Sequence, residues 1–432
     1  MNTASGNRTK ASEWTNFGAL ALVLALGMAF PPLPLFASGR GSATSPPGVP
    51  AVSARAVVIM DQATGSLLYA KSPDLAIPPA SLTKLVTLHI VYLEIAAGRL
   101  SRDELLTIDA RDCSPYVPFG STLMYLAPGM RVSVIDLMRG AAVVSGNDAA
   151  FALARRISGS NEDFARLMNA EMKRLGLEGL HFVEPSGLSE KNMVTAREFA
   201  QFCRYYIAVH PESLKELHSL SSIEFPRPEH ATATFKPKPG TIQRNKNNLV
   251  IDYPGCDGLK TGYIFESGFN LAATAIREGT RFVIVTLGGV GSSASGGGEQ
   301  RVRDGTRLLD FAFAGWKTAI PALPPLPVLR AWNGEEPRLA LEASSPLAVT
   351  IPTDQLPDLA VRVEVPRYVE APIQAGEKLG EIVYTSGNHV VRRVNLVAAK
   401  AVDRGNFLIV LKDSIERLLE TILHGEDRNH LP

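Results

Sequence analysis

Cysteine is scarce in this chain, which has 432 residues and only three cysteines, Cys113, Cys203 and Cys256. Their wide spacing excludes a disulfide framework and a zinc-type cluster, so at most one pair can bond, and we expect no metal and no other cofactor. Net charge is also nearly absent, because 44 lysines and arginines are balanced by 43 aspartates and glutamates. A chain with so small a net charge lacks the positive excess that attracts nucleic acid, and we expect no such partner.

Long apolar runs are absent except near the N-terminus. There, Arg8 and Lys10 precede an uncharged run over residues 17–30, and small residues follow at positions 37 and 38. This order is typical of a secretory signal peptide, which we assign to residues 1–37. A retained membrane anchor is the alternative, but the prolines between residues 31 and 34 argue against a continuous spanning helix. In either case we expect an exported protein, periplasmic or otherwise extracytoplasmic, on the outer face of the cytoplasmic membrane.

The segment 54–320 carries signals for both helices and strands. Two short apolar runs around Gly65 predict a hairpin, and helical spacing dominates from residue 134 to 208. Strand patterns return after residue 248 and include the strongly apolar run 280–289, which belongs to an antiparallel meander. Strands at both ends with helices between them predict an α+β domain, in which helices pack on the faces of an antiparallel sheet.

The segments around this domain are simpler. Residues 38–53 are rich in Gly, Ser and Pro and predict a flexible lead-in, whereas the prolines of residues 321–327 predict a stiff linker. Residues 328–405 alternate apolar and polar side chains between turn signals, which predicts a small all-β domain. That domain offers no cluster of His, Cys and Asp, and we assign it no chemistry.

Residues 406–424 predict an amphipathic tail helix. Such a helix can lie in a membrane interface, and the alternative is that it docks on the β domain or on a partner. Its acids outnumber its bases, so the tail gains nothing electrostatically from anionic lipid. The apolar stripe consists of Phe407, Leu411, Ile415, Leu418 and Ile422.

A serine stands where an apolar helix is predicted to begin, just after Pro79. Lys84 follows Ser81 by three residues, so both side chains share one helix face and the amine can reach the hydroxyl. A serine becomes a nucleophile when a neighbouring base takes its proton, and a lysine can be that base if burial or nearby positive charge lowers its pKa. Alone, the pattern is weak, because Ser81 can equally be a helix cap and Lys84 a solvated charge.

Two further polar motifs follow in order. Ser145-Gly146-Asn147 interrupts the helical zone 134–156, and a glycine with an asparagine at such a break exposes Ser145 and Asn147. Lys260-Thr261-Gly262 lies in the strand-rich region. The set Ser-x-x-Lys, Ser-x-Asn and Lys-Thr-Gly is of the type found in β-lactamases and penicillin-binding proteins.

With their flanks over residues 143–150 and 257–263, the three motifs resemble those of the serine D-Ala-D-Ala carboxypeptidases, the low-molecular-mass penicillin-binding proteins of peptidase family S11. Pro185-Ser186-Gly187-Leu188 and Gly268-Phe269-Asn270-Leu271 resemble that family too, and the resemblance covers essentially the whole mature chain. It implies a penicillin-binding-protein-like α+β catalytic domain. It also implies an enzyme that removes the terminal D-alanine from peptidoglycan stem pentapeptides and that β-lactams inhibit.

The chemistry gives each motif a role. Ser81 attacks the carbonyl between the two D-alanines and forms an acyl-enzyme, while Lys84 accepts its proton. Lys260 assists, because its positive charge disfavours a second ammonium nearby. Ser145 relays the proton to the leaving amine, and Asn147 holds the substrate amide. The structural alternatives are that Asn147 only caps a helix and that Lys260 is a solvated strand lysine.

The Lys260-Thr261-Gly262 strand offers backbone hydrogen bonds to an extended peptide, and Gly262 leaves room for its approach. The family resemblance suggests that Thr261 and a downstream arginine, best matched by Arg281, hold the terminal carboxylate, although Arg281 can also be a surface charge. The oxyanion hole needs two backbone N–H groups, one at Ser81 and one at Tyr263 or Ile264. Ile264 departs from the family pattern, since a hydroxyl often stands there.

Two other functions compete with this one. A class A β-lactamase needs a glutamate that positions water, and the nearest candidate, Glu184, lies directly before Pro185 rather than in the usual motif. We therefore expect slow deacylation of penicillin. A non-enzymatic, wall-binding protein is the third possibility, and the completeness of the motifs argues against it. His89 and Cys256 are expected to have no catalytic role.

Overall fold

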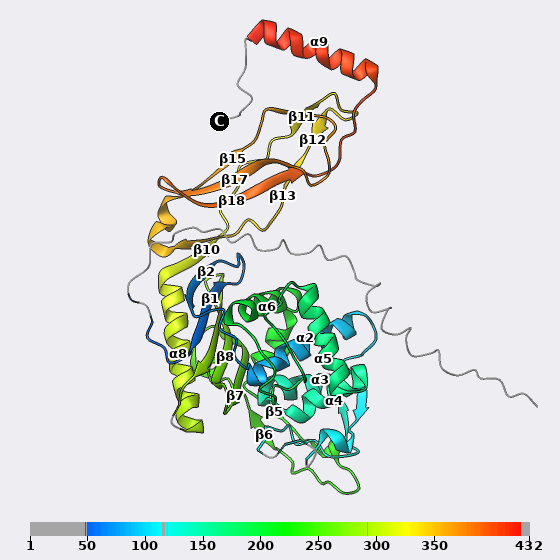
Figure 1. Cartoon of the computed structure of the whole chain (residues 1–432), viewed down its shortest axis with the longest axis vertical. Coiled ribbons are helices and arrows are strands. Elements are labelled where there is room, and N and C mark those ends of the chain that lie inside the picture. Colours follow the sequence, from blue (N-terminus) through cyan, green and yellow to red (C-terminus); the bar gives the residue numbers. More distant parts are fainter. Residues whose placement is uncertain (1–47, 49, 115–116, 119, 292, 425–432) are drawn as a thin grey trace, which may run out of the picture. The chain divides into compact units, whose positions relative to one another are not determined.

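The computed structural model describes residues 48, 50–114, 117–118, 120–291 and 293–424. The signal peptide and most of the lead-in that the sequence predicts lie outside these described residues. Within them, a mixed α+β unit precedes an all-β segment and a final helix (Figure 1). The predicted α+β class is therefore confirmed.

A five-stranded antiparallel sheet organises the α+β unit, with the order β2-β1-β9-β8-β7. The predicted hairpin around Gly65 and the predicted meander are both present as paired strands. Because β7 pairs only with β8 in this sheet, its other side is a free edge. The strands are β1 (Ala56–Asp61), β2 (Leu67–Lys71), β7 (Cys256–Ile264), β8 (Gly268–Arg277) and β9 (Thr280–Gly289).

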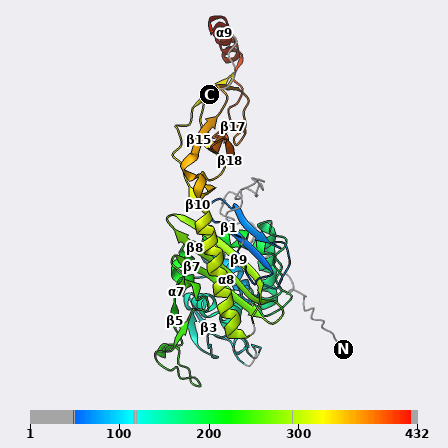
Figure 2. The same ribbon diagram turned by 90° about the vertical axis from the view of Figure 1, so that its left-hand side faces the viewer.

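Helices cover both faces of the sheet. On β9, Phe282 and Ile284 pack in the core with α8, whereas Val283 and Val285 pack in the larger core with the other helices. This alternation follows from the two-residue period of a strand. Figure 2 shows α8 lying along the sheet, and Figure 1 shows α2, α3, α4, α5 and α6 grouped on the opposite side, whereas α7 packs in the same core as α8. The helices are α2 (Thr83–Ala96), α3 (Val134–Arg139), α4 (Asn147–Ser158), α5 (Asn161–Arg174), α6 (Ala196–Val209), α7 (Leu249–Asp252) and α8 (Ala294–Gly315).

Short elements connect these helices to the sheet. They are the single turns η1 (Ala80–Leu82), η2 (Ala110–Asp112), η3 (Gly140–Val144), η4 (Leu214–His218) and η5 (Pro228–His230), and the short strands β3 (Leu105–Thr107), β4 (Arg131–Ser133), β5 (Ser222–Glu224) and β6 (Ile242–Arg244).

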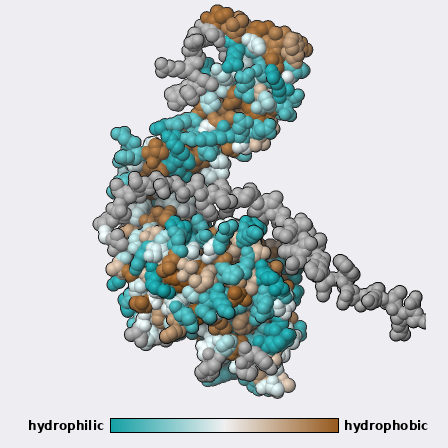
Figure 3. Space-filling view, viewed as in Figure 1, coloured by the Kyte–Doolittle hydropathy of each residue, from teal (hydrophilic) through white to brown (hydrophobic). Residues whose placement is uncertain are grey.

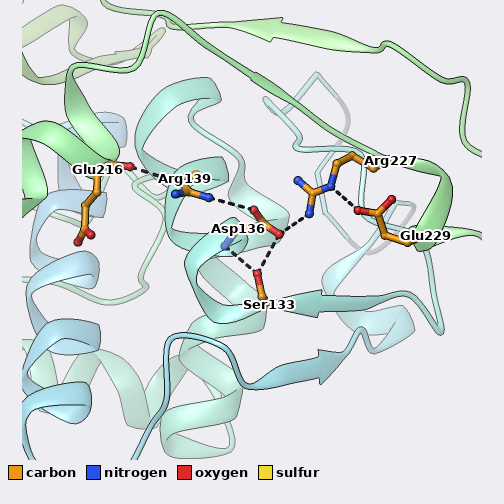
Figure 4. Close-up of polar contacts among 6 residues, drawn as sticks. All are labelled: Ser133, Asp136, Arg139, Glu216, Arg227 and Glu229. Carbon is orange, nitrogen blue, oxygen red and sulfur yellow. Dashed lines mark hydrogen bonds and ion pairs between the residues drawn. The ribbon is translucent and has the colours of Figure 1, made fainter.

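Asp136 ties α3 to the segment that carries β5 and β6. Its carboxylate accepts hydrogen bonds from Arg227 Nη2 at 2.7 Å and Ser133 Oγ at 2.8 Å, and Arg139 bridges it to the Glu216 carbonyl (Figure 4). Burial alone raises the pKa of Asp136, but the bonds from Arg227 and Ser133 outweigh it and hold that pKa below its usual value. The network fixes α3 and so the turn that follows it.

The segment beyond residue 320 forms small sheets, as the alternating pattern predicts. One has the order β13-β18-β17-β15, another has β12-β11-β16, and β14 pairs with β10, which precedes the proline-rich segment. Alternate side chains fill two small apolar cores. The strands are β10 (Trp316–Ala319), β11 (Leu329–Trp332), β12 (Arg338–Leu339), β13 (Leu341–Ala343), β14 (Val349–Pro352), β15 (Leu359–Glu364), β16 (Tyr368–Glu370), β17 (Lys378–Ser386) and β18 (His389–Ala398), and one further turn is η6 (Thr353–Asp358).

The final helix, α9 (Phe407–His424), contacts the β segment through its polar face. Asp413 accepts a 2.6 Å hydrogen bond from the Asn333 N–H, and Glu416 pairs with Arg330. The apolar face is left in solvent, as the brown surface over α9 in Figure 3 shows. No helix among the described residues has the length and apolarity to cross a bilayer. The exposed apolar side chains are Phe407, Leu408, Leu411, Ile415, Leu418, Leu419 and Ile422.

Candidate active site

Ser81 lies in the η1 turn, directly before α2, where the sequence predicts a helix start. Lys84, in the first turn of α2, donates hydrogen bonds to Ser81 Oγ at 3.0 Å, Asn147 Oδ1 at 2.5 Å and the Ser186 carbonyl at 2.6 Å. Its side chain is fully buried, with 0% of the residue exposed. A solvated lysine is thereby excluded, and the structure brings the first two motifs into direct contact.

Burial lowers the pKa of Lys84 to about 7, while the negative charges of Glu184 and Asp148 partly oppose this shift. We expected the charge of Lys260 to depress this pKa, but desolvation is the main cause. The pKa of Lys260 is lowered well below its usual value, first by burial and then by the charges of Lys84, Arg301 and Lys246. At neutral pH, the site can therefore hold an unprotonated amine beside the serine.

Ser145 stands between two helical segments, as the sequence predicts. The π turn η3 ends at Val144, the next residue Ser145 has a left-handed φ of 66°, and α4 begins at Asn147. The next side chain, Asp148, accepts hydrogen bonds from the N–H groups of Met124, Leu126 and Ala149 at 2.8–3.0 Å. This buried carboxylate ties the segment with Met124 and Leu126 to the start of α4. It thereby fixes the orientation of Asn147, the residue before it.

Glu184 organises the loop that completes the Lys84 environment. Its carboxylate accepts hydrogen bonds from the Ser186 N–H at 2.7 Å, the Gly187 N–H at 2.6 Å and Asn192 Nδ2 at 2.9 Å. These bonds present the Ser186 carbonyl to Lys84. Because Glu184 is used in this way, it does not resemble a carboxylate that is free to activate water. The sequence drew attention to Glu184 only as a hydrolytic candidate and missed this role.

Gly187 allows the same loop to approach the serine turn. Its φ is +84°, and a Cβ atom there would lie 1.9 Å from the Ala80 carbonyl oxygen and 2.9 Å from the Ser81 nitrogen. No side chain fits at such a distance, and the positive φ independently favours glycine. The contact explains why the Pro-Ser-Gly-Leu stretch accompanies the serine motif.

Lys260 and its neighbours on β7 lie against the other side of the Ser81 turn from the Gly187 loop. Lys260 is buried, and its Nζ donates to the Thr261 carbonyl at 3.0 Å. A Cβ atom on Gly262 would lie 2.6 Å from the Pro79 carbonyl oxygen and 3.1 Å from the Ser81 nitrogen. Gly262 therefore lets β7 pack against the serine turn itself, in addition to the room for ligand that the sequence suggested.

The carbonyl contacts of β7 show which residues face its free edge. The Leu259 carbonyl bonds to His218 Nδ1 at 3.1 Å, and the Thr261 carbonyl accepts a hydrogen bond from Lys260 Nζ. Neither carbonyl therefore points to β8. In an antiparallel strand, the N–H and C=O of one residue point to the same side, and the side alternates along the chain. With no bulge between Gly258 and Ile264, the next residue that faces the edge is Tyr263.

Arg281 is not brought to this part of β7. Its guanidinium pairs with Asp257 at 2.6 and 2.7 Å, and it lies opposite Ile276 of β8, five residues from the partner of Thr261. The structure thus does not support the predicted carboxylate role of Arg281. Its charge is already balanced by Asp257.

Arg301 of α8 is the guanidinium that does reach the Thr261 region. Its Nη1 lies 3.4 Å from the Gly262 carbonyl, and burial lowers its pKa to about 10. Thr261 pairs with Leu271, whose side chain belongs to the core on the α8 face, so Thr261 and Arg301 share that face. No motif in the sequence marks Arg301, because only the packing of α8 brings it to β7.

The chain matches the models of two protein families. The family model described as D-alanyl-D-alanine carboxypeptidase matches residues 41–291, and that of the penicillin-binding protein 5 C-terminal domain matches residues 328–404. The chain is 31% identical over 400 residues to the D-alanyl-D-alanine carboxypeptidase DacC of Escherichia coli, covering 91% of this chain and 94% of that protein. It is 32% identical to DacD of Salmonella typhimurium, covering 85% and 91%.

Solved structures agree with these matches. Penicillin-binding protein 5 from Haemophilus influenzae is similar with a TM-score of 0.73 and 29% identity, covering 84% of this chain and all of that one. Penicillin-binding protein D2 from Listeria monocytogenes, solved in its cefotaxime-bound form, is similar with a TM-score of 0.52 and 28% identity, covering 62% of this chain and all of that one.

Proposed function

The chain belongs to the D-alanyl-D-alanine carboxypeptidase family, and from this premise we propose that Ser81 is its nucleophile and Lys84 its general base. The enzyme removes the terminal D-alanine from peptidoglycan peptides through a serine acyl-enzyme and is a target of β-lactams. The observation that carries the assignment of residues is the buried Lys84 amine, which touches both Ser81 and Asn147. We also propose that residues 54–320 form the catalytic domain and that residues 328–405 form the β domain.

Acylation uses the perturbed amine. Unprotonated Lys84 takes the Ser81 proton as the oxygen attacks the carbonyl, and the pKa of about 7 suits a base that works near neutrality. The Ser81 N–H and the Tyr263 N–H stabilise the oxyanion, since Tyr263 faces the free edge of β7 whereas Ile264 faces β8. Of the two residues that the sequence offers for the second oxyanion N–H, we therefore propose Tyr263 rather than Ile264.

The second motif serves the leaving group and the substrate amide. Ser145, which lies between η3 and α4, relays the proton from the amine to the departing D-alanine. Asn147 is held by its contact with Lys84 and can offer its amide to the peptide backbone. Lys260 holds its amine beside Thr261, where the substrate carboxylate arrives, by donating to the Thr261 carbonyl.

The substrate carboxylate is bound at Thr261 by Arg301, which we put in place of Arg281. Both Thr261 and Arg301 lie on the α8 face, and a guanidinium recognises a carboxylate with two parallel hydrogen bonds. The peptide itself adds to the free edge of β7 as a further strand. Gly262 keeps that edge next to the nucleophile.

The β-lactamase alternative is disfavoured by the contacts of Glu184. A hydrolytic glutamate must hold water beside the acyl-enzyme, whereas Glu184 accepts three backbone N–H bonds and that of Asn192. Hydrolysis of the acyl-enzyme that forms when Ser81 attacks penicillin is accordingly slow.

Labelling with a fluorescent penicillin tests the assignment. The wild-type protein should be labelled at one site and should release D-alanine from a pentapeptide, whereas Ser81→Ala should do neither. The control Ser344→Ala, at an exposed position of the β segment, should do both. Labelling of Ser81→Ala would refute the nucleophile. Hydrolysis of several penicillin molecules per second by the wild type would favour the β-lactamase instead.

We also propose that the protein is exported and that α9 touches the outer face of the cytoplasmic membrane. Its exposed apolar face and its polar contacts with the β segment support an orientation in which lipid covers the apolar side chains. The predicted signal peptide supports export.

A further inference from the structure

The end of the lead-in segment is bound to the middle of α8. Asp304 of this helix is buried, and one of its oxygens accepts hydrogen bonds from the Ser53 N–H at 2.9 Å and from Ser53 Oγ at 2.6 Å. Its other oxygen accepts a bond from Gln300 Nε2 at 2.8 Å, which holds the carboxylate in place. Further along the helix, Arg307 donates to the Ala51 carbonyl at 3.0 Å. Ser53 is therefore fixed to a helix residue that follows it by 251 positions.

Arg301 lies on the same helix, three residues before Asp304, so both side chains share one face of α8. Its guanidinium contacts the Gly262 carbonyl at 3.4 Å, and the proposed function gives it the substrate carboxylate. No ion pair joins Arg301 to a carboxylate in the part of the chain that the structure describes, and burial is the cause of its lowered pKa. The position of this guanidinium therefore depends on the backbone of α8 rather than on a partner of opposite charge.

The first turns of α8 need support from other segments. They contain three consecutive glycines over residues 296–298, and glycine weakens a helix because it loses the most backbone freedom on folding. A Cβ atom on Gly297 would lie 1.9 Å from an atom of the Phe269 ring, so the helix is packed tightly on β8 at this point. The centre of the same ring lies 5.9 Å from Arg301 Cζ. A small shift of α8 should therefore be transmitted directly to Arg301.

We propose that Ser53 and Asp304 are positioning residues for substrate recognition, because their hydrogen bonds hold α8 where Arg301 meets the substrate carboxylate. This inference rests on the proposed role of Arg301. The lead-in is thus a part of the carboxylate site although it touches no substrate. Without this contact the middle of α8 shifts and binds the carboxylate less tightly, whereas Ser81 and Lys84, which lie on η1 and α2, keep their places.

The test compares two peptide donors that end in D-Ala-D-Ala, one with a free terminal carboxylate and one with a terminal amide. In the full chain, Asp304→Ala should raise KM about tenfold for the carboxylate donor, with kcat nearly unchanged, and should leave both constants for the amide donor as they are. Ser53→Ala removes one of the two bonds and should raise the same KM about threefold. The double variant should match Asp304→Ala, because both changes remove one interaction.

Asp310→Ala is the matched control. Asp310 lies further along α8 and accepts a 2.8 Å hydrogen bond from the Tyr253 hydroxyl, so its loss also weakens the packing of the helix. It should change KM for neither donor. Rates are expressed per mole of protein that a saturating penicillin labels, so unfolded protein does not contribute. If Asp304→Ala does not fold, the milder Ser53→Ala decides the question by the same comparison.

Arg301→Leu in the same assay separates this inference from the proposed function. If Arg301→Leu loses the carboxylate donor selectively and the Ser53 and Asp304 variants do not, the positioning role is wrong and the role of Arg301 stands. If Arg301→Leu shows no such selectivity, the carboxylate assignment fails and the positioning role fails with it. Equal losses on both donors in Asp304→Ala, or selective loss in Asp310→Ala, would mean that the lead-in contact serves only the stability of the helix.

Discussion

Lys84 Nζ and Asn147 Oδ1 lie 2.5 Å apart, so two motifs separated by 63 residues meet in one buried hydrogen bond. The same amine contacts Ser81 and the Ser186 carbonyl. Ser81, Asn147 and Ser186 therefore define the position of one nitrogen atom, and a change at Asn147 or Ser186 should alter the contact of this amine with Ser81.

The acylation rate should rise with pH through about 7. Below its pKa, Lys84 is protonated and cannot accept the Ser81 proton, and above it the amine is free. The second-order rate of penicillin labelling between pH 5.5 and 8.5 measures this. Lys84→Arg should reduce the rate by at least about a hundredfold and abolish the rise. A flat profile in the wild type would exclude Lys84 as the base.

Replacing Asp148 by asparagine should have two separable effects. The asparagine amide cannot accept all the N–H bonds that Met124, Leu126 and Ala149 direct at the carboxylate, so the free energy of unfolding should fall by about 2 kcal/mol. The negative charge also raises the pKa of Lys84, so its removal should move the midpoint of the acylation profile to lower pH. Chemical denaturation and the same labelling assay measure the two effects. An unchanged midpoint would mean that Asp148 acts only on stability.

Arg301 and Arg281 form a matched pair for the carboxylate site. Arg301→Leu should lower kcat/KM by about a hundredfold for a donor that ends in a free carboxylate and far less for the same donor ending in an amide. Arg281→Leu should affect both donors equally, because its partner is Asp257. Selective loss of the carboxylate donor in Arg281→Leu would restore the assignment that the sequence suggested.

Motifs that are local in sequence were the easiest to predict. Ser81 and Lys84 share a helix face, and the break at Ser145 follows from glycine and asparagine inside a helical pattern. Arg301 was missed because its side chain reaches β7 only through the packing of α8, which no spacing rule encodes. The role of Glu184 was missed because a loop carboxylate that binds backbone N–H groups has no pattern of its own. The fold class followed from the order of strands and helices, whereas the edge position of β7 required the structure.

Two buried histidines should make the protein less stable in acid. Burial lowers the pKa values of His218 and His210 to about 3, below the usual value near 6.5. Between these two values the unfolded chain binds protons that the folded chain does not. The stability that the neutral histidines contribute is therefore fully present above about pH 6.5 and is lost as the pH falls towards 3. The stability advantage of the wild type over His218→Asn should shrink over this range in urea titrations.

The tail should bind lipid through apolar contact rather than charge. A protein that lacks residues 406–432 should not bind vesicles of neutral lipid, whereas the full chain should bind them with little dependence on salt. Phe407→Ser and Leu418→Ser should each weaken binding about tenfold, because both side chains are exposed on the apolar face. Lys412→Ala, on the same helix, is the control. Strong salt dependence would mean that headgroup charge governs the binding.

The three cysteines are all unpaired and buried, at Cys113, Cys203 and Cys256. Burial raises the pKa of each thiol, to about 11 for Cys113 and Cys256. The thiols of the native protein should therefore not react with alkylating reagents. The protein should also fold in an oxidising compartment without thiol oxidases. Because one thiol lies near η2, one in α6 and one at the start of β7, alkylation followed by peptide mapping would report which part of the molecule opens first, with no engineered label.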